Sequence, residues 1–218
     1  MAPNYGPKIV RDGLVLYLDA ANVKSYPGSG ATWSDLSGNG NNGTITGSVP
    51  YSTLFGGVLN TPGTTGNYIN ISSINLTATN HTVMVASRYV NSSQNGRVLS
   101  GLSNNWLLGH HTSGNTRGDY FANGWVYNPS NTGGDVWGIY TGTGNISTDT
   151  WEAYDNAVLQ ASNTAGSQGP NGLTIGRYGP SNTEYSNAYV GFVMCYNRVL
   201  TASEIQQNFG ALRGRYSI

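Results

Sequence analysis

The chain has 218 residues, of which ten are basic and ten acidic, so its formal net charge is zero. Charged residues make up 9% of the chain, against roughly 25% in an average soluble protein. A neutral surface does not attract phosphate backbones or anionic lipid, so the composition argues against nucleic-acid and membrane partners. The chain instead carries 31 Gly and 15 Tyr. Tyr with Gly, Ser and Asn is the mixture of recognition loops, and Gly and Asn also supply the turns of β proteins.

The strand candidates are short, apolar or aromatic, and separated by turn residues at fairly even spacing. In chain order they are Leu14 to Asp19, Tyr68 to Ile71, Thr82 to Val90, Arg97 to Ser100, Trp106 to His110, Gly118 to Phe121, Trp125 to Tyr127, Asp135 to Tyr140, Trp151 to Leu159, Leu173 to Ile175 and Ala188 to Tyr196. This spacing is typical of an all-β sandwich or barrel. We expect one sandwich domain over residues 14–218, preceded by an extended arm, residues 1–13, that contains Pro3 and Pro7.

One helix is predicted after the last strand. Thr201 and Glu204 have the spacing of a capping box, in which each residue satisfies the other's free backbone amide. Ile205, Phe209 and Leu212 then follow at i, i+4 and i+7 and form one apolar face. Gly210 and Gly214 are expected to end the helix.

The single cysteine, Cys195, lies in an apolar run and is expected to be a small core residue, with no intrachain disulfide. The N-terminal residues lack the apolar core of a signal peptide, and no apolar run is long enough to cross a membrane. A recognition-type composition without an export signal fits a virion component, which is assembled in the host cytoplasm and released by lysis.

The titratable residues do not suggest catalysis or a metal. Glycoside hydrolases need two carboxylates beside the scissile bond, and Asp149, Glu152 and Asp155 have odd spacings that alternate faces of a strand. His110 and His111 are adjacent, so a strand would point them to opposite faces. We therefore expect no catalytic residue and no cofactor.

The spacing of Asp119 and Asn123 faintly resembles the calcium loop of legume lectins. Arg117 stands where that loop has a second acid, and calcium prefers several charged oxygen ligands. No metal is therefore expected here.

Aromatic residues gather among Asn, Gly, Ser and Thr between residues 106 and 140. Sugars have apolar C–H faces and many hydroxyls, so aromatic rings beside amides suit them. The candidate ligand-binding residues are Trp125, Tyr127, Trp106, Tyr120, Trp137 and Asn123. Most large aromatics fill cores, so we expect one or two of these rings to be exposed, with the loops around Trp125 and Tyr127 forming the contact.

Both ends of the chain resemble a known family. The matching segments are Leu14 to Asn22, Trp33 to Thr44 (W-S-D-L-S-G-N-G-N-N-G-T) and Gly191 to Ile205, with Leu173 to Arg177 in the middle. These resemble the concanavalin A-like (laminin-G-like) domains of bacteriophage structural proteins. The resemblance implies a jelly-roll β-sandwich of two antiparallel sheets, one of them concave.

The chain departs from that family at two places. Gly66 to Ile69 stands where members often carry an Asp-Tyr-Val step, so an acidic group is missing. Tyr154 to Ala157 stands where members often have an Asn-Gly hairpin. The Gly is absent here, so the sequence leaves it undecided whether the hairpin forms.

The resemblance and the composition together indicate a non-enzymatic phage virion protein, exposed as a capsid decoration or fibre component. Its expected partners are other virion proteins and surface glycans, with a homo-oligomer left open. The alternatives are a tail adhesin that recognises host polysaccharide and a glycan-cleaving enzyme. Sequence does not separate capsid from tail, because both locations use a stable sandwich with binding loops.

Overall fold

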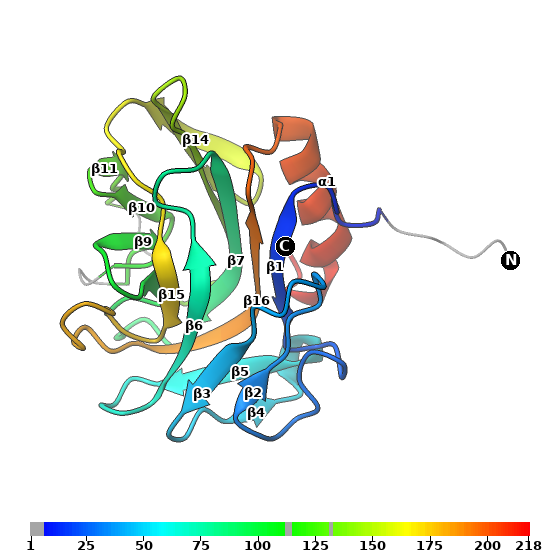
Figure 1. Cartoon of the computed structure of the whole chain (residues 1–218). Coiled ribbons are helices and arrows are strands. Elements are labelled where there is room, and N and C mark those ends of the chain that lie inside the picture. Colours follow the sequence, from blue (N-terminus) through cyan, green and yellow to red (C-terminus); the bar gives the residue numbers. More distant parts are fainter. Residues whose placement is uncertain (1–6, 112–114, 131–132) are drawn as a thin grey trace, which may run out of the picture.

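A computed structural model describes residues 7–111, 115–130 and 133–218. Its strands form two antiparallel sheets packed face to face (Figure 1). Sheet A runs in the order β14 (Val158–Asn163), β13 (Thr150–Asp155), β12 (Gly138–Asn145), β7 (His81–Tyr89), β16 (Asn187–Tyr196), β5 (Val58–Pro62) and β4 (Tyr51–Ser52), and β1 (Leu14–Asp19) also pairs with β16. Sheet B runs β11 (Trp125–Tyr127), β10 (Asp119–Ala122), β9 (Trp106–Gly109), β8 (Leu99–Gly101), β15 (Asn171–Ile175), β6 (Tyr68–Asn75), β3 (Gly43–Thr46) and β2 (Thr32–Trp33).

The helices of the described residues are α1 (Ala202–Leu212) and two short 3₁₀ turns, η1 (Leu54–Gly56) and η2 (Arg213–Arg215). The predicted fold class, a sandwich of two antiparallel sheets followed by one short C-terminal helix, is confirmed. No helix in these residues combines the length and the apolar character that a membrane span needs.

Two apolar layers hold the molecule together. The first fills the space between the sheets, and the second lies between sheet A and α1. Strand β16 serves both layers: Val193 and Cys195 belong to the first, whereas Phe192 and Met194 belong to the second. Burial on both faces explains why this strand is a continuous apolar run rather than an alternating one. It also confirms Cys195 as a buried core residue.

The Gly- and Asn-rich loop after Trp33 completes the free edge of β1. One Asp35 oxygen accepts the Tyr17 amide at 2.9 Å, and the Asn41 side chain donates to the Val15 carbonyl at 2.7 Å. An unpaired strand edge exposes backbone donors and acceptors that invite aggregation. The conspicuous motif of this loop is therefore part of the scaffold.

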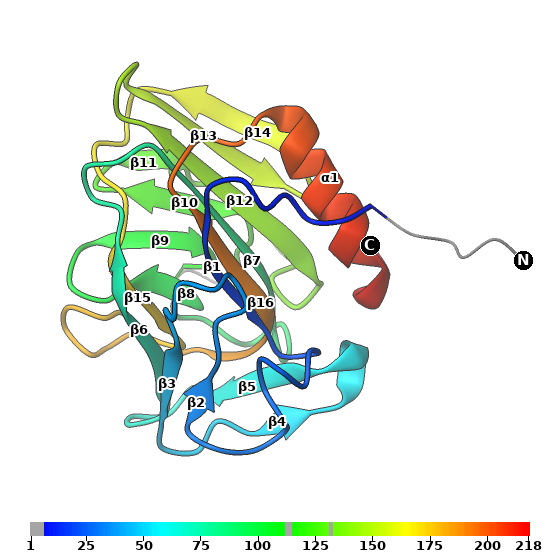
Figure 2. The same cartoon turned by 45° about the vertical axis from the view of Figure 1, so that its right-hand side comes forward.

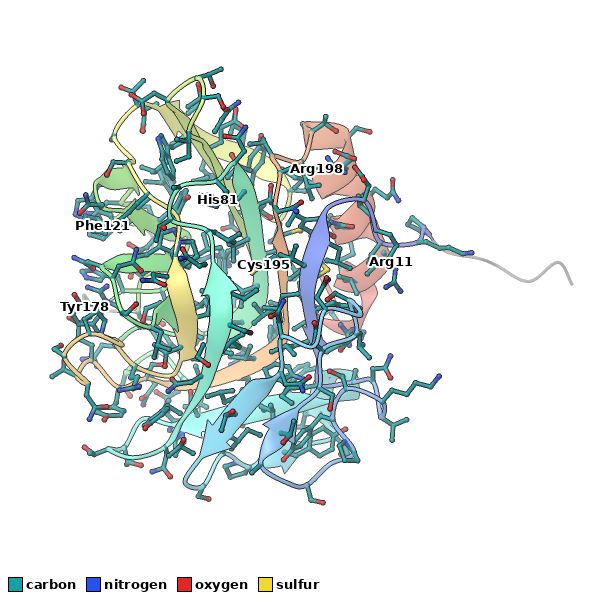
Figure 3. All side chains as sticks on the ribbon, in the orientation of Figure 1. Arg11, His81, Phe121, Tyr178, Cys195 and Arg198 are labelled. Atoms are coloured by element: carbon teal, nitrogen blue, oxygen red, sulfur yellow. The ribbon has the colours of Figure 1, made fainter. Side chains whose placement is uncertain are left out.

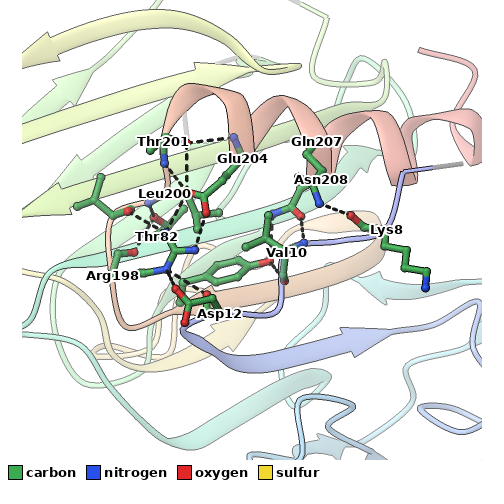
Figure 4. Close-up of polar contacts among 12 residues, drawn as sticks. Lys8, Val10, Asp12, Thr82, Arg198, Leu200, Thr201, Glu204, Gln207 and Asn208 are labelled. Atoms are coloured by element: carbon green, nitrogen blue, oxygen red, sulfur yellow. Dashed lines mark hydrogen bonds and ion pairs between the residues drawn. The ribbon is translucent and has the colours of Figure 1, made fainter.

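The start of the helix and the chain near the N-terminus hold each other (Figure 4). Thr201 caps α1 and Glu204 returns the bond, as predicted, and Arg198 forms an ion pair with Glu204 at 2.6 Å. The Val10 amide donates to the Asn208 side chain at 2.8 Å. Residues 7–13 of the predicted arm thus lie against α1 and sheet A, whereas Pro3 and the rest of residues 1–6 lie outside the described residues.

The apolar face of α1 is confirmed, because Ile205, Phe209 and Leu212 are all buried. The prediction that Gly210 ends the helix was wrong. The helix continues through Gly210 to Leu212, since packing on sheet A outweighs the low helix propensity of one glycine.

Three strand predictions need correction. The segment Asp135 to Tyr140 begins with a turn, in which the Val136 amide donates to the Gly133 carbonyl, and the strand starts only at Gly138. The segment Trp151 to Leu159 is two strands joined at Asn156 and Ala157, which have φ of 51° and 61°. The hairpin therefore persists without its glycine. Strands β2 to β5 were missed because they are short and lack apolar runs.

Candidate functional site

The outer faces of the two sheets differ. The outer face of sheet A is covered by α1 and the residues that lead into β1. Figures 1 and 2 show α1 on the side of the molecule opposite β6, β9 and β15, so none of the described helices covers the outer face of sheet B. The face of sheet B is therefore the broad surface available to a ligand.

Three aromatic side chains pack together at the β11 end of this face. Trp125 is half-buried, and its ring lies edge-on to Phe121 and to His111, with ring centroids 5.1 Å apart in both pairs. Figure 3 places Phe121 and Tyr178 on the same side of the molecule, away from α1. Partial burial and the nearby charge of Arg97 lower the pKa of His111. The imidazole is therefore neutral at pH 7 and offers both a donor and an acceptor.

A polar group held by Arg97 adjoins these rings. Its guanidinium forms an ion pair with Glu184 at 2.6 Å and donates to Asn105 at 2.7 Å. Its flat face lies 4.0 Å from the centroid of the Tyr178 ring. Arg97 is 6% exposed, so these contacts hold its guanidinium in one orientation and also orient the Glu184 carboxylate and the Asn105 amide beside it.

The loop that carries Glu184 is locally strained. Glu184 has φ of 51° and Asn182 has φ of 54°. Residues other than glycine rarely adopt this left-handed backbone conformation, and such strain persists only where the surroundings enforce it. Here the Arg97 amide donates to the Glu184 carbonyl at 3.0 Å, and Ser186 donates to the Arg97 carbonyl at 2.9 Å.

A second arginine lies next to this group, because Arg177 directly precedes Tyr178, whose ring contacts the Arg97 guanidinium. The Arg177 guanidinium stacks 3.8 Å from the Tyr68 ring centroid and donates to side-chain oxygens of Thr174, Asn182 and Asn70. Together these residues form what we call the aromatic–arginine face, made of Tyr68, Arg97, Asn105, His111, Phe121, Trp125, Arg177, Tyr178 and Glu184.

Three of the predicted binding residues do not reach this face. Trp106 and Tyr120 are fully buried between the sheets and contact each other edge-on, and Trp137 is buried beside Tyr216 under α1. Strand alternation turns the rings of Trp106 and Tyr120 inward, and Trp137 precedes β12 and packs in the layer between sheet A and α1. These three predicted binding residues are therefore buried rather than available at the surface. The expectation that most of the rings fill cores holds for them.

The other three predicted residues are accessible but not grouped. Trp125 belongs to the aromatic–arginine face. Tyr127 packs beside Gly118 at the sandwich edge, and its hydroxyl donates to Gln160 of β14 at 3.4 Å. Asn123 is exposed in the turn between β10 and β11 and donates to Ser167 at 2.9 Å. A contact built from all three remains a prediction.

The two histidines point in opposite directions, as predicted. His111 contacts Trp125 on the surface, whereas His110 is fully buried between Tyr89 and Tyr140, with ring centroids 4.6 and 5.1 Å away. Burial lowers the pKa of His110 to about 4. The neutral ring places Nδ1 3.0 Å from the Thr116 carbonyl, so it belongs to the scaffold.

The loop that resembles the legume-lectin calcium site has a different geometry. Asp119 is fully buried and Asn123 is exposed, so the two side chains do not converge. Burial raises the pKa of Asp119 to about 6. Across the described ranges, no three side chains of His, Cys, Asp or Glu lie close enough together to hold a metal ion.

The acidic residues near β13 are also dispersed. Asp155 forms an ion pair with Arg117 at 2.8 Å, whereas Glu152 accepts the Tyr154 hydroxyl at 2.7 Å on the opposite face. Asp149 sits in the preceding turn and accepts the Trp151 indole. These three residues do not form the facing pair that glycoside hydrolysis needs.

Comparison with protein families and with curated proteins finds no match. Solved structures do match. The binding domain of Paraclostridial Mosquitocidal Protein 1 has a TM-score of 0.65 and 16% identity, over 91% of this chain and 52% of that one. Domain 4 of AbnA, a GH43 extracellular arabinanase from Geobacillus stearothermophilus in complex with arabinotriose, has a TM-score of 0.65 and 15% identity, over 90% and 98%.

The ligand-binding domain of botulinum neurotoxin serotype D in complex with N-acetylneuraminic acid has a TM-score of 0.62 and 14% identity, over 92% and 51%. This chain therefore spans nearly all of the arabinanase domain but about half of each toxin domain. At these identities the likeness concerns the fold alone, which is a β-sandwich.

Sequence reasoning missed most of the aromatic–arginine face. Its residues come from strands β6 and β10–β11 and from the segments around residues 97, 111 and 177–184, which only the folded sheet brings together. The one available signal was Arg177, which ends the middle segment that resembles the phage family.

Proposed function

We propose that this chain is a non-enzymatic glycan-binding protein whose ligand contacts the aromatic–arginine face. One observation carries the proposal. Half-exposed Trp125 stands with Phe121 and His111 beside the fixed polar groups of Arg97 and Glu184, on the sheet face that none of the described helices covers.

The chemistry of this face suits a sugar. Aromatic rings contact the apolar C–H face of a pyranose, and amides, carboxylates and guanidinium groups bind its hydroxyls. Because Arg97 and Glu184 already hold each other, a ligand does not have to order them, which lowers the entropic cost of binding. Two matching domains, from an arabinanase and a neurotoxin, are described in complex with arabinotriose and N-acetylneuraminic acid.

The arrangement of acids supports binding without cleavage. Glycosidases place two carboxylates about 5–9.5 Å apart, one of them able to donate a proton. Among the described residues of the aromatic–arginine face, Glu184 is the single carboxylate and forms an ion pair with Arg97 at 2.6 Å, so these residues include no facing carboxylate pair.

Binding to a glycan array tests this function. We expect the wild-type chain to bind at least one glycan and Trp125→Ala to lose that binding while keeping the same melting temperature. Leu159→Ala, which removes an exposed apolar side chain of β14, is the control and should bind normally. Unchanged binding by Trp125→Ala would place the ligand elsewhere.

We further propose that the protein acts on a phage particle, as a capsid decoration or fibre component in contact with other virion proteins. The support is the resemblance of residues 14–22, 33–44 and 191–205 to phage structural domains, together with the neutral, Tyr- and Gly-rich composition. Quantitative mass spectrometry of purified particles tests it. Hundreds of copies indicate a decoration protein, a handful indicates a tail adhesin, and absence contradicts a virion role.

A further inference from the structure

Arg177 is a buried cation without an anion. Its residue exposure is 7%, comparable with the 6% of Arg97. Arg97, Arg117, Arg198 and Arg215 each form an ion pair with a carboxylate. Within the described residues, Arg177 has no such partner: its hydrogen bonds go to the neutral oxygens of Thr174, Asn182 and Asn70.

A buried charge is costly unless it is paired, and neutral oxygens offset only part of that cost. The ring of Tyr68 at 3.8 Å contributes a cation–π contact. A guanidinium carries five N–H donors, and the three hydrogen bonds above leave two without an assigned partner. The Arg177 guanidinium is thus oriented and stabilised by its neighbours, but none of the described carboxylates balances its positive charge.

The charge is not cancelled from elsewhere on the face. Glu184 is the carboxylate of the neighbouring group, and it is bound to Arg97 at 2.6 Å. Arg177 therefore adds a net positive charge beside two tyrosine rings, Tyr68 and Tyr178. A planar, fixed guanidinium binds a planar carboxylate through two parallel hydrogen bonds better than it binds neutral hydroxyls.

We propose that Arg177 makes the aromatic–arginine face selective for glycans that carry a carboxylate, as sialic and uronic acids do. This inference rests on the proposed glycan-binding function and names the ligand class for the same face. The carboxylate would take the unassigned donors of Arg177, while the rings beside it contact the sugar.

Isothermal titration of the full chain against matched ligands tests the proposal. One pair is trigalacturonic acid and its methyl ester, which share a backbone and differ in charge; the other is 3′-sialyllactose and lactose. Charge-assisted hydrogen bonds contribute about 1.5–3 kcal/mol, which corresponds to roughly 10- to 150-fold in Kd. We expect the acid of at least one pair to bind at least about tenfold more tightly than its neutral counterpart, and the pair identifies the kind of acidic sugar.

Variants locate the effect. Arg177→Gln should abolish the preference for the acid, so that the acid and its neutral counterpart bind with Kd values within about twofold of each other. Arg88→Gln is the matched control, because Arg88 lies on sheet A and donates to the carbonyls of Tyr89 and Val90. If Arg177→Gln does not fold, Arg177→Lys, which keeps the charge but not the fork, replaces it, and the wild-type comparison stands on its own.

The outcomes separate the two proposals. Equal binding of acid and neutral ligand, or a stronger response to sulfated than to carboxylated sugar, overturns the carboxylate assignment and leaves glycan binding intact. Retained acid preference in Arg177→Gln overturns the role of Arg177. Failure of every glycan to bind overturns the proposed function itself.

Discussion

Replacing the buried carboxylate of Asp119 with an amide should stabilise the protein at neutral pH. Asp119 is fully buried and, among the described residues, forms no ion pair. Burial penalises the charged form and raises the pKa to about 6, although the Thr116 hydroxyl lowers it in part. Asparagine has nearly the same shape and carries no charge.

The expected gain in stability of Asp119→Asn follows from the raised pKa of Asp119. Moving from 3.8 to about 6 is a difference of roughly 2, and each pKa unit corresponds to about 1.4 kcal/mol, so ionisation costs the folded state about 3 kcal/mol. Because the folded state binds this proton more tightly than the unfolded chain, the wild type keeps the associated stability below about pH 4. It loses that stability as the pH rises through 6. For a chain of this size, 3 kcal/mol raises Tm by about 6–12 °C.

Scanning calorimetry at pH 7.5 and pH 4, in the presence of EDTA, measures the stability with Asp119 ionised and with Asp119 protonated. Asp119→Asn should melt well above the wild type at pH 7.5 and close to it at pH 4. Asp149→Asn, at an exposed turn, should change Tm little at either pH. A variant less stable than the wild type at pH 7.5, or equally shifted at both pH values, would refute the reasoning, since the carboxylate would then have a partner in the folded state.

Three further changes have definite expected results. Ala157→Gly should raise the free energy of unfolding by about 0.5–1 kcal/mol in urea titrations, because Ala157 has φ of 61°, which glycine adopts more easily. Ala161→Gly, within strand β14, is the control and should lower the free energy of unfolding. A lower free energy of unfolding in both variants would contradict this explanation of the turn. Phe209→Ala should cost about 3 kcal/mol by removing the ring that packs α1 on sheet A, and a loss below 1 kcal/mol would show that the helix is not held by this layer. The Arg198 guanidinium holds the pKa of Glu204 at about 2, so the free energy of unfolding of the wild type should fall as the pH drops from about 4.5 to 2. In Glu204→Gln, the free energy of unfolding should depend less on pH over this range. An unchanged pH dependence counts against the ion pair.

Local rules were enough for much of the scaffold. β1 and β11 begin and end where their apolar and aromatic residues do, and the Thr201–Glu204 capping box starts α1 as predicted. These elements are specified by contacts within a few residues. The end of the helix was not predictable in this way, because packing on sheet A carries it past Gly210.

The candidate site depends on long-range pairing, which sequence does not display. Trp125 was found because it lies in an aromatic-rich segment, but the same reasoning also selected Trp106 and Tyr120, whose rings face the core. The faces of these strands are set by their register with β8 and β10. Arg97 and Arg177 are 80 residues apart in the chain, and folding, which pairs β8 with β15, brings Arg97 against Tyr178, the residue after Arg177.

If a glycan contacts the outer face of sheet B, the tryptophan indole N–H resonances should report where it binds. Of the five tryptophans, Trp125 is half-exposed, whereas Trp33, Trp106, Trp137 and Trp151 are buried. In an NMR titration with a glycan that binds, we expect the indole resonance of Trp125 to shift in proportion to occupancy while the other four stay in place. A bound glycan that leaves the Trp125 resonance unmoved would contradict binding at this face.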